Sequence, residues 1–555
     1  MRRKSRLLLL LLAVMALLTF AGAHSPERTV LGNDNDDSEQ EKIEDSFDKA
    51  LLLAKANYAG QVDAEKMTKA SIQGMLRTLD PHSSYLDPKE WAEFQNQQRS
   101  RYSGIGSTIA QRNGKVYIVA PFFGTPAYKA GILYGDQITA IDGQSAENWN
   151  STQVSNKLLG PEGTPVSVTV ARLGVDHPIT FKVVRDYVPL PSIQNYFMIG
   201  NGVGYINLDR GFNTTTAAET KKALQQLHQQ GMTSLVLDLR GNRGGLVDQA
   251  VKVVNDFVYS GQLIVSMHGR PSVFPSQDVA ATNTSPDDVP MVVLINRGTA
   301  SAAEIVAGAL QDHDRARLVG ENSFGKGLVQ SVYTLQDGSG LTLTAGKYYT
   351  PSGRLIQRDY SNRSFYDYYL QRGDKEELQL HHPEEKHTDA GRPVYGGDGI
   401  NPDVVAKIPT KFFELQRVWL EPVFAFSREL AAGRIPGYES WKVEKPADHE
   451  HRLAPTDYQV TDKMLPVFKK FLADHKDIKI NIDRADTDWS TFVKDQIRFE
   501  LCTAAYGQET ALEVLLEGDA QMQKALAELP KAKEMAADIR KFWASGRVSG
   551  ALRRN

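Results

Sequence analysis

The residue that could act as a nucleophile lies in the segment Asn296–Glu304, where an apolar, strand-like run gives way to a helical pattern that begins at Ser301. A serine nucleophile needs an exposed hydroxyl beside N–H donors that can hold a developing oxyanion. The first turn of a helix supplies such free N–H groups. Serine at this position is also a common helix N-cap. On this segment alone, the N-cap is the better interpretation.

A candidate general base, Lys326, lies between two glycines in the segment Ser323–Gln330, with Phe324 and Leu328 close by. A lysine acts as a base only when it is neutral, and an apolar surrounding favours the neutral form because it removes water from the amine. Gln330 could orient the amine through a hydrogen bond. For a lone lysine, a solvated surface position in a glycine turn is the better interpretation.

The same stretch matches the spacing of a phosphate-binding loop, since Gly320 is followed by Gly325 and Lys326. That motif requires Ser or Thr after the lysine to hold magnesium, whereas this chain has Gly327. No acidic strand end pairs clearly with it. Nucleotide binding is therefore an alternative that the sequence disfavours, and no cofactor is expected.

A glycine turn at Asp238–Gly245 follows another apolar run and precedes a helical pattern. Successive N–H groups in such a turn can form a nest for an anion, which would supply half of an oxyanion hole. The simpler interpretation is a tight turn whose backbone angles require glycine.

No convincing Ser-His-Asp arrangement is found in the sequence. His313 lies at an expected helix end, where the helix dipole favours a protonated imidazole. His381 and His382, with Glu384 and Glu385 nearby, are only a weak indication of metal binding, and no metal site is expected. Both histidine positions are better interpreted as solvated polar loops.

The elements that must position these segments alternate between strands and helices from about 187 to 412. Near-continuous apolar strands predict a sheet that is covered on both faces, and therefore an α/β core. Strands are expected at 203–208, 234–239 and 292–295, and helices at 216–230, 246–258 and 301–312. Residues 360–397 are rich in Tyr, Asp, Glu and His, and are expected to be a surface insertion.

Other regions flank this core. Short alternating strands and turn pairs predict a small β-rich module at 99–186, with a helix that Ser151 caps. Helical spacing of apolar residues fills 40–98, and the tail at 413–555 is mostly helical. The polar, acid-rich stretch 24–39 is expected to be a disordered leader.

Residues 1–23 have the pattern of a secretory signal peptide. Basic residues near the N-terminus precede an apolar run at 7–20, and Ala21-Gly22-Ala23 fits the cleavage rule. The run is short for a membrane span, so removal is favoured over a retained anchor. Cys502 is the only cysteine and is expected on a buried helix face, so no intrachain disulfide can form.

The bulk composition is that of a folded, soluble protein of several domains. The chain has 555 residues, of which 41% are apolar and 24% charged. The formal net charge of -3, without a basic stripe beside aromatic residues, gives no reason to expect nucleic-acid binding.

Taken together, the three glycine-flanked segments resemble one family, the carboxy-terminal processing peptidases, also called tail-specific proteases. The resemblance is carried by Ser301, Lys326 and Gln330 at the family's spacings. It implies a Ser/Lys dyad with no metal and no catalytic histidine. It also implies an oxyanion hole formed by the N–H of Ala302 and that of Gly244 or Gly245.

The resemblance extends upstream to a PDZ domain. Its carboxylate-binding loop resembles Tyr102-Ser103-Gly104-Ile105-Gly106, and the stretch from Gly124 to Asp136 resembles the rest of its core. A PDZ groove binds an extended C-terminus by strand addition. The resemblance implies protein substrates with exposed C-termini, a homodimer or higher homo-oligomer formed through 40–98, and a possible adaptor lipoprotein.

We therefore expect a multidomain α+β protein with an α/β, crotonase-like peptidase core, an inserted PDZ domain and helical N- and C-terminal regions. The expected function is that of an exported serine endopeptidase of the bacterial periplasm or its membrane face. The alternative is a non-catalytic PDZ adaptor on a degenerate peptidase core.

Overall fold

The computed structural model describes residues 34–361, 368–369, 384–475, 478, 480 and 486–544. The chain divides into two compact units, Met1–Met75 and Leu76–Asn555. The expected signal peptide and the two adjacent histidines at 381–382 lie outside the described residues. Within the described ranges, no helix is both long and apolar enough to cross a membrane.

The N-terminal unit contains helix α2 (Asp34–Asn57) and most of helix α3 (Ala64–Arg77). Helix α2 begins inside the stretch 24–39, so the expectation of a disordered leader is wrong at its end. Acidic residues are favoured at the start of a helix by its dipole, which explains how so polar a stretch becomes helical.

The core of the larger unit is a six-stranded sheet with the strand order β10-β11-β12-β15-β16-β21. Only β10 is antiparallel to its neighbour, and the remaining pairs are parallel. The strands are β10 (Asn195–Gly200), β11 (Val203–Asn207), β12 (Ser234–Asp238), β15 (Met291–Ile295), β16 (Arg317–Gly320) and β21 (Val404–Val405). Every residue of β11, β12 and β15 is buried, as their apolar runs predicted.

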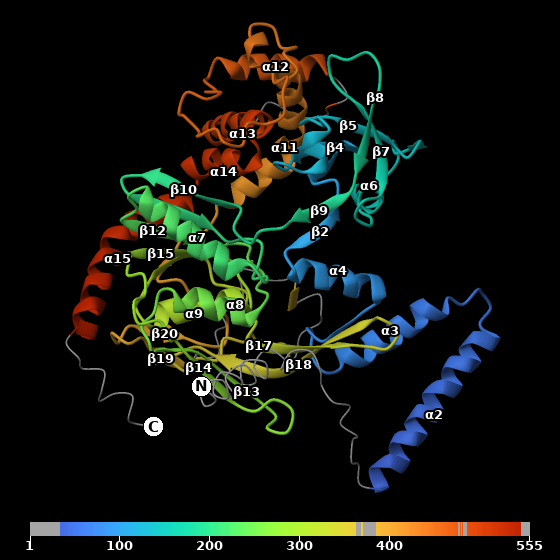
Figure 1. The fold of residues 1–555 in the computed structure, drawn as a ribbon, viewed down its shortest axis with the longest axis vertical. Helices are drawn as coiled ribbons and strands as arrows, with labels where there is room; N and C mark the ends of the chain where they lie inside the picture. The colour runs from blue at the N-terminus through green and yellow to red at the C-terminus, as the bar shows by residue number, and fades with distance from the viewer. Residues whose placement is uncertain are drawn as a thin grey trace, which may run out of the picture. The chain divides into compact units, whose positions relative to one another are not determined.

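Helices cover both faces of this sheet (Figure 1). On one face lie α7 (Thr216–Gln229), α8 (Val247–Asn255) and α9 (Ala302–Asp312), which pack against Leu235 and Leu237 of β12. On the other face lies α15 (Ala520–Ala544), which packs against Val236 of the same strand. The C-terminal region therefore completes the core around this sheet.

A second sheet lies beside the first and is built around β18 (Gly340–Tyr349). Strands β1 (Ser84–Leu86), β13 (Leu263–Gly269) and β17 (Leu328–Thr334) all pair with β18, and β14 (Gln277–Ala280) pairs with β13. Helix α4 (Pro88–Gln98) follows β1, and its Trp91 is buried. Residues from before the β-rich module thus share a sheet with residues that follow the candidate lysine.

The β-rich module has the sheet order β3-β4-β5-β7-β8, with β3 at an edge and β6 (Gln144–Ser145) paired to β5. Its strands are β3 (Ser107–Arg112), β4 (Lys115–Pro121), β5 (Gln137–Ile141), β7 (Pro165–Ala171) and β8 (Ile179–Val184), and its helices are α5 (Pro126–Lys129) and α6 (Ser151–Leu158). Strands β2 (Arg101–Gly104) and β9 (Asp186–Pro189) pair where the chain enters and leaves it. The N-cap of α6 is Asn150 rather than the expected Ser151.

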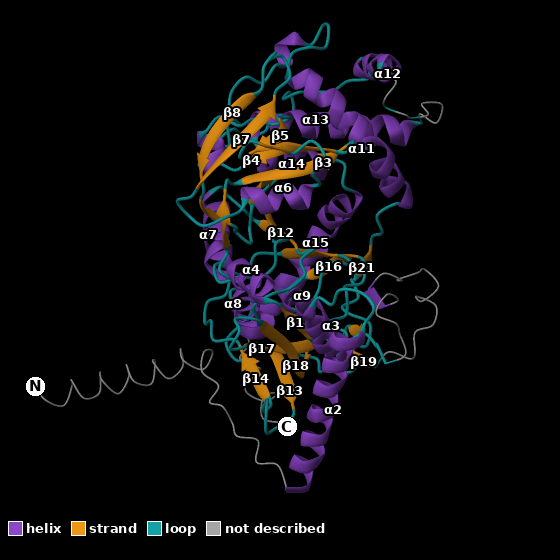
Figure 2. Cartoon of the chain, turned by 90° about the vertical axis from the view of Figure 1, so that its right-hand side faces the viewer, coloured by secondary structure: helices purple, strands orange, loops and turns teal. Residues whose placement is uncertain are grey.

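The remaining C-terminal helices form a separate apolar cluster beside this module (Figure 2). They are α11 (Thr410–Ala431), α12 (Met464–Asp474) and α13 (Thr487–Tyr506), with a short 3-10 turn, η2, at Glu439–Trp441. Helix α14 (Gln508–Glu517) packs through Ala511 and Val514 in a smaller cluster with Cys502 of α13. The Tyr134 hydroxyl donates to Glu500 at 2.8 Å, and the ring of Tyr117 contacts Phe424. Cys502 is fully buried on α13, as expected.

The end of the expected surface insertion is partly buried. Strands β19 (Glu385–His387) and β20 (Pro393–Tyr395) form a hairpin, in which Val394 is buried. Arg392 from this hairpin pairs with Asp314 and Asp403. This part of 360–397 therefore belongs to the core rather than to a solvated loop.

Candidate active site

Ser301 lies in a tight turn between strand β15 and helix α9, and its backbone is strained. Its φ of +56° and ψ of −121° are unusual for a residue with a β-carbon. Neighbouring hydrogen bonds hold the turn in place. The Thr299 hydroxyl donates to the carbonyl of Leu239 at 2.9 Å, and the Ala300 N–H donates to the carbonyl of Asn242 at 2.8 Å. The turn presents the serine at the start of a helix, as an activated nucleophile requires.

The glycine turn at 241–245 lies directly against this serine. A β-carbon at Gly244, whose φ is +91°, would come within 2.6 Å of Ser301 Cβ and 2.9 Å of the Ala302 nitrogen. The N–H of Gly244 donates to Asn242 Oδ1 at 2.9 Å. Among the described residues, none accepts a hydrogen bond from the N–H of Gly245 or Ala302. Of the two glycines expected to serve an oxyanion, Gly245 thus has the N–H that is left available.

Lys326 is held by the hydrogen bond that the sequence predicted. Its Nζ donates to Gln330 Oε1 at 2.8 Å. The Nε2 of Gln330 donates in turn to the carbonyl oxygen of His82 at 2.7 Å. A carbonyl can only accept, so the orientation of the Gln330 amide is determined, and its oxygen faces the amine.

Burial lowers the pKa of Lys326, although the charges of Asp80 and Glu304 oppose the shift. Burial also lowers the pKa of His82, to about 3, and the positive charge of Lys326 adds to this effect. The imidazole beside the lysine is therefore neutral at ordinary pH. The site favours a neutral amine at lower pH than a solvated lysine would.

Glu304 joins the serine and lysine segments, a role that we did not predict from the sequence. Its side chain is fully buried, and Oε2 accepts the N–H of Ser301 at 2.8 Å and the N–H of Lys326 at 2.9 Å. Oε1 accepts the N–H of Gly325 at 2.7 Å and the hydroxyl of Ser323. Burial raises the pKa of Glu304, whereas these hydrogen bonds lower it. The sequence did contain one signal for this role, because Glu304 is the single acidic residue in the otherwise apolar first turn of α9.

Tyr348 makes a second connection between the same two segments. Its hydroxyl contacts the carbonyl oxygen of Ser301 at 2.8 Å and that of Lys326. Burial raises the pKa of Tyr348 well above its ordinary value, so the hydroxyl keeps its proton. Nothing in the sequence around residue 348 indicated this contact, because it arises from the pairing of distant strands.

The loop expected to bind a carboxylate is shorter than the sequence indicated. Tyr102, Ser103 and Gly104 belong to strand β2 and pair with β9, so only Ile105 and Gly106 are outside strands. The Ile105 carbonyl accepts the N–H of Ala127, and the Gly106 carbonyl accepts the hydroxyl of Thr125, both at 2.8 Å. Edge strand β3 follows at once.

Tyr102 and Ser103 are half-buried in this strand. Burial raises the pKa of Tyr102 to about 12. The Ser103 hydroxyl is buried and has no hydrogen-bond partner among the described residues. These two side chains are therefore built into the strand rather than placed on an open loop.

His313 is not in a solvated loop, and that interpretation was wrong. It ends helix α9, where its Nδ1 lies 2.8 Å from Asp389 Oδ2 and its Nε2 lies 2.6 Å from the carbonyl oxygen of Leu263. Burial opposes its charged form, but the hydrogen bond and charge of Asp389 outweigh burial and raise the pKa of His313. The imidazole ties α9 to the 384–395 hairpin and has no place in the serine site.

The phosphate-loop alternative does not fit the structure. Gly320 has a φ of +136°, and a β-carbon there would meet the Ile295 carbonyl oxygen at 2.0 Å, so close strand packing requires this glycine. The N–H groups of Gly325 and Lys326, which a phosphate would need, already bind the carboxylate of Glu304. In the part of the chain that the structure describes, no cluster of potential metal ligands is present.

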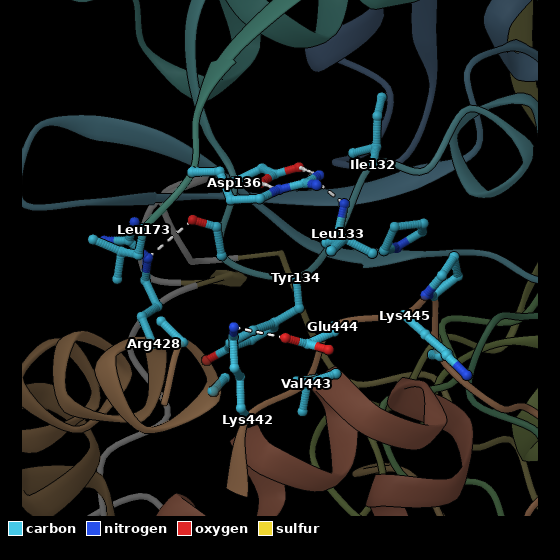
Figure 3. Close-up of a pocket in the computed structure, with 18 of the residues that line it drawn as sticks. Ile132, Leu133, Tyr134, Asp136, Leu173, Arg428, Lys442, Val443, Glu444 and Lys445 are labelled. Atoms are coloured by element: carbon cyan, nitrogen blue, oxygen red, sulfur yellow. Dashed lines mark hydrogen bonds and ion pairs between the residues drawn. The ribbon is translucent and has the colours of Figure 1, made fainter. Parts of the chain in front are cut away.

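A separate cavity of about 240 Å³ lies between the β-rich module and the C-terminal helices (Figure 3). Several of its charged side chains already have a partner within the cavity wall. Arg172 contacts Asp136 at 2.7 Å and Lys442 contacts Glu444 at 2.6 Å, while Arg428 donates to the Gly135 carbonyl at 2.9 Å. The cavity contains no activated nucleophile, so the chemistry is concentrated at the Ser301 turn.

Three known protein families match parts of the chain. Residues 202–361 match Peptidase family S41, and residues 123–172 match the PDZ domain. Residues 12–90 match the family described as activating protease CtpB N-terminal domain. The S41 match includes Ser301, Lys326 and Gln330, and the PDZ match includes most of the β-rich module.

Several curated proteins that are similar to this chain are named carboxy-terminal processing proteases. A carboxy-terminal-processing protease of Bartonella bacilliformis is 38% identical over 307 residues, which are 55% of this chain and 70% of that protein. The carboxy-terminal processing proteases CtpB and CtpA of Bacillus subtilis are 35% and 34% identical. The CtpB alignment covers 58% of this chain and 67% of the relative, and the CtpA alignment covers 64% and 76%.

Proposed function

Because this chain belongs to the carboxy-terminal processing proteases of Peptidase family S41, and is thus a serine endopeptidase, we propose that Ser301 is its nucleophile and Lys326 its general base. The observation that carries the proposal is the half-buried amine of Lys326, which Gln330 orients through a hydrogen bond. Glu304 joins the backbone of Lys326 to that of Ser301.

The residue roles follow from this geometry. Neutral Lys326 takes the proton of the Ser301 hydroxyl, and the serine oxygen attacks the scissile carbonyl. The N–H groups of Ala302 and Gly245 hold the oxyanion. The lysine then protonates the leaving amine, and water hydrolyses the acyl-enzyme to free the new C-terminus. The depressed pKa of Lys326 supports this scheme, since it makes the neutral base available below the ordinary range of lysine.

The PDZ domain binds peptide substrates, and we place recognition of their C-terminal tails at edge strand β3. An edge strand offers unpaired N–H and C=O groups to an added strand. Helix α6 lies beside β3, so that a tail would occupy the groove between them. The short loop Ile105–Gly106 then receives the terminal carboxylate.

Export and assembly complete the proposal. Residues 1–23 direct the chain to the bacterial periplasm, and an adaptor lipoprotein brings it substrates. A homodimer formed through helix α2 is supported by the apolar side chains that this helix exposes. They are Ile43, Phe47, Leu52 and Leu53. Cell fractionation and light scattering of the mature chain test these two points, and a cytoplasmic monomer would contradict both.

The dyad is tested by cleavage of unfolded casein by the mature chain, beside Ser301→Ala and Lys326→Ala, with a fluorophosphonate probe as a second readout. We expect cleavage and probe labelling by the unchanged chain only, with all three proteins equally folded. A folded Lys326→Ala variant that still cleaves casein contradicts the role of the lysine. If the unchanged chain neither cleaves nor labels, the non-catalytic adaptor is the better reading.

A further inference from the structure

A turn outside the serine and lysine segments, Asp80–Ser83, is joined to the candidate base. Gln330 uses both polar ends of its amide to make this link, since Oε1 accepts from Lys326 Nζ and Nε2 donates to the carbonyl of His82. We propose that this turn is a positioning element for Lys326, and that Tyr368 and Tyr369 lock it through the ring of His82. The proposal rests on the proposed role of Lys326 as the base.

The turn is rigid because Asp80 closes it from within. Its Oδ1 accepts the N–H of His82 at 2.7 Å and the N–H of Ser83 at 2.8 Å, while Oδ2 accepts the Ser83 hydroxyl at 2.7 Å. The Asp80 side chain is 7% exposed. Strand β1 begins directly after the turn and pairs with β18, which also pairs with β17, the strand of Gln330. The carbonyl of His82 is therefore fixed relative to the Gln330 amide.

The ring of His82 is clamped by a tyrosine hydroxyl on each nitrogen. Tyr369 Oη lies 3.0 Å from Nδ1 and 3.0 Å from the carbonyl oxygen of Pro81, and Tyr368 Oη lies 2.9 Å from Nε2. Because a carbonyl only accepts, the Tyr369 hydroxyl donates to Pro81, and its oxygen accepts a hydrogen bond from Nδ1–H of His82. Nε2 then accepts from Tyr368. The neutral imidazole tautomer that carries its proton on Nδ1 is compatible with all three hydrogen bonds.

This network continues into the lysine loop. Gln357 donates through Nε2 to the Tyr368 hydroxyl at 3.1 Å and accepts the N–H of Gly327 at 2.9 Å. The rings of Phe324 and Tyr368 lie 5.7 Å apart, and that of His82 lies 5.4 Å from Tyr368. The turn, the two tyrosines and Phe324 thus form one aromatic, hydrogen-bonded cluster that includes the segment of Lys326, and Arg358 stacks on its rings.

Loss of the hydrogen bonds between the two tyrosines and the turn would have two consequences for the Lys326 amine. The carbonyl of His82 would move away, so the Gln330 amide could rotate and the amine would lose its fixed direction. Water would also reach the amine and move the pKa of Lys326 back toward its ordinary value. The charged groups that act on the amine, Asp80 and Glu304, are not themselves changed by these substitutions.

The test uses His82→Ala and the double variant Tyr368→Phe/Tyr369→Phe in the full mature chain. Cleavage of a fluorogenic peptide and labelling by a fluorophosphonate are measured from pH 5 to 10. We expect kcat to fall roughly tenfold, because His82→Ala removes two hydrogen bonds between the turn and the tyrosine hydroxyls and the double variant removes three. KM stays unchanged, and the acid limb of the pH profile moves to higher pH. Tyr360→Phe is the matched control, since the Tyr360 ring lies 6.1 Å from Tyr368, whereas the hydroxyls on the His82 ring belong to Tyr368 and Tyr369.

Lys326→Ala, measured in parallel, distinguishes the role of Lys326 as the base from the positioning role of the Asp80–Ser83 turn. If Lys326→Ala is inactive while the folded His82→Ala variant keeps its kcat and its acid limb, the positioning role is wrong and the dyad stands. A fall in kcat with an unmoved acid limb also overturns the positioning role, since general loosening would produce it. If Lys326→Ala stays active, the dyad and the positioning role are both wrong. If His82→Ala does not fold, the double tyrosine variant decides.

Discussion

In the proposed function, the Ser301 turn and the PDZ loop at Ile105–Gly106 would each meet a polypeptide substrate through backbone N–H groups, but the structure stabilises the two in different ways. The serine turn is held by a fully buried carboxylate, that of Glu304, which accepts the N–H of Ser301. The same carboxylate accepts three further hydrogen bonds from the lysine segment, so it holds four donors in all. The PDZ loop is held instead by the buried side chain of Ile105 and by its carbonyls, which accept hydrogen bonds from Phe122, Thr125 and Ala127. Bond-making chemistry requires atoms held to fractions of an ångström, whereas a binding loop must leave its N–H groups for the ligand.

If this difference holds, the largest effect comes from Glu304→Ala. Four donors would lose a buried acceptor, at about 1–3 kcal/mol for each unsatisfied group. We expect at least roughly a hundredfold loss of casein cleavage and a clear loss of thermal stability. Glu304→Gln keeps one acceptor oxygen and is expected to lose less. If Glu304→Ala cleaves casein as fast as the unchanged chain, the serine turn does not depend on the buried carboxylate, and the proposed difference from the PDZ loop is wrong.

Gly244→Ala should be the next most harmful change at the serine site. Its β-carbon would overlap Ser301 Cβ at 2.6 Å, and its φ of +91° disfavours any side chain. A shift of the nucleophile by about 1 Å costs roughly a hundredfold in rate. The measurement is the rate of fluorophosphonate labelling. Gly241→Ala, at a φ of +75° with no atom within 4 Å, is the matched control and should lose much less.

The pH profile of cleavage tests the electrostatics of the same site. Because burial depresses the pKa of Lys326, the base becomes neutral, and activity rises, at a pH below the ordinary lysine range. On the acid limb we expect roughly a tenfold change in kcat for each pH unit. A profile that is flat from pH 5 to pH 9 contradicts a lysine base.

The PDZ loop should respond to substitution in binding but not in chemistry. A β-carbon at Gly106, whose φ is +78°, would lie 2.3 Å from Thr125 Cβ, so Gly106→Ala should displace the loop. We expect a several-fold higher KM for substrates with free C-terminal tails and no change in probe labelling of the serine. Reduced labelling would show that the loop also controls the serine site.

The smallest effect is expected from Ser103→Ala. The Ser103 hydroxyl is buried and finds no hydrogen-bond partner in the described part of the chain, so its removal leaves nothing unsatisfied. Thermal stability and tail affinity should stay within experimental error. A marked loss of tail binding would mean that this hydroxyl contacts the substrate.

Much of the fold could be predicted because its signals are local. Buried parallel strands appear as continuous apolar runs, which located β12 and β15. The predictions failed where polar residues are buried by distant partners. His313 was interpreted as solvated, since its carboxylate partner Asp389 lies 76 residues away. The end of the 24–39 stretch was interpreted as disordered from composition alone, although it begins α2.

By itself, the sequence determined the family, the peptidase core, the PDZ module and the Lys326–Gln330 hydrogen bond, because each depends on residues of fixed type at short spacing. Only the tertiary structure decided that His82 anchors Gln330, that Tyr348 spans the serine and lysine segments, and that helix α15 covers the second face of the sheet. Such contacts depend on which apolar faces pack together over the whole chain, and no local pattern encodes that choice.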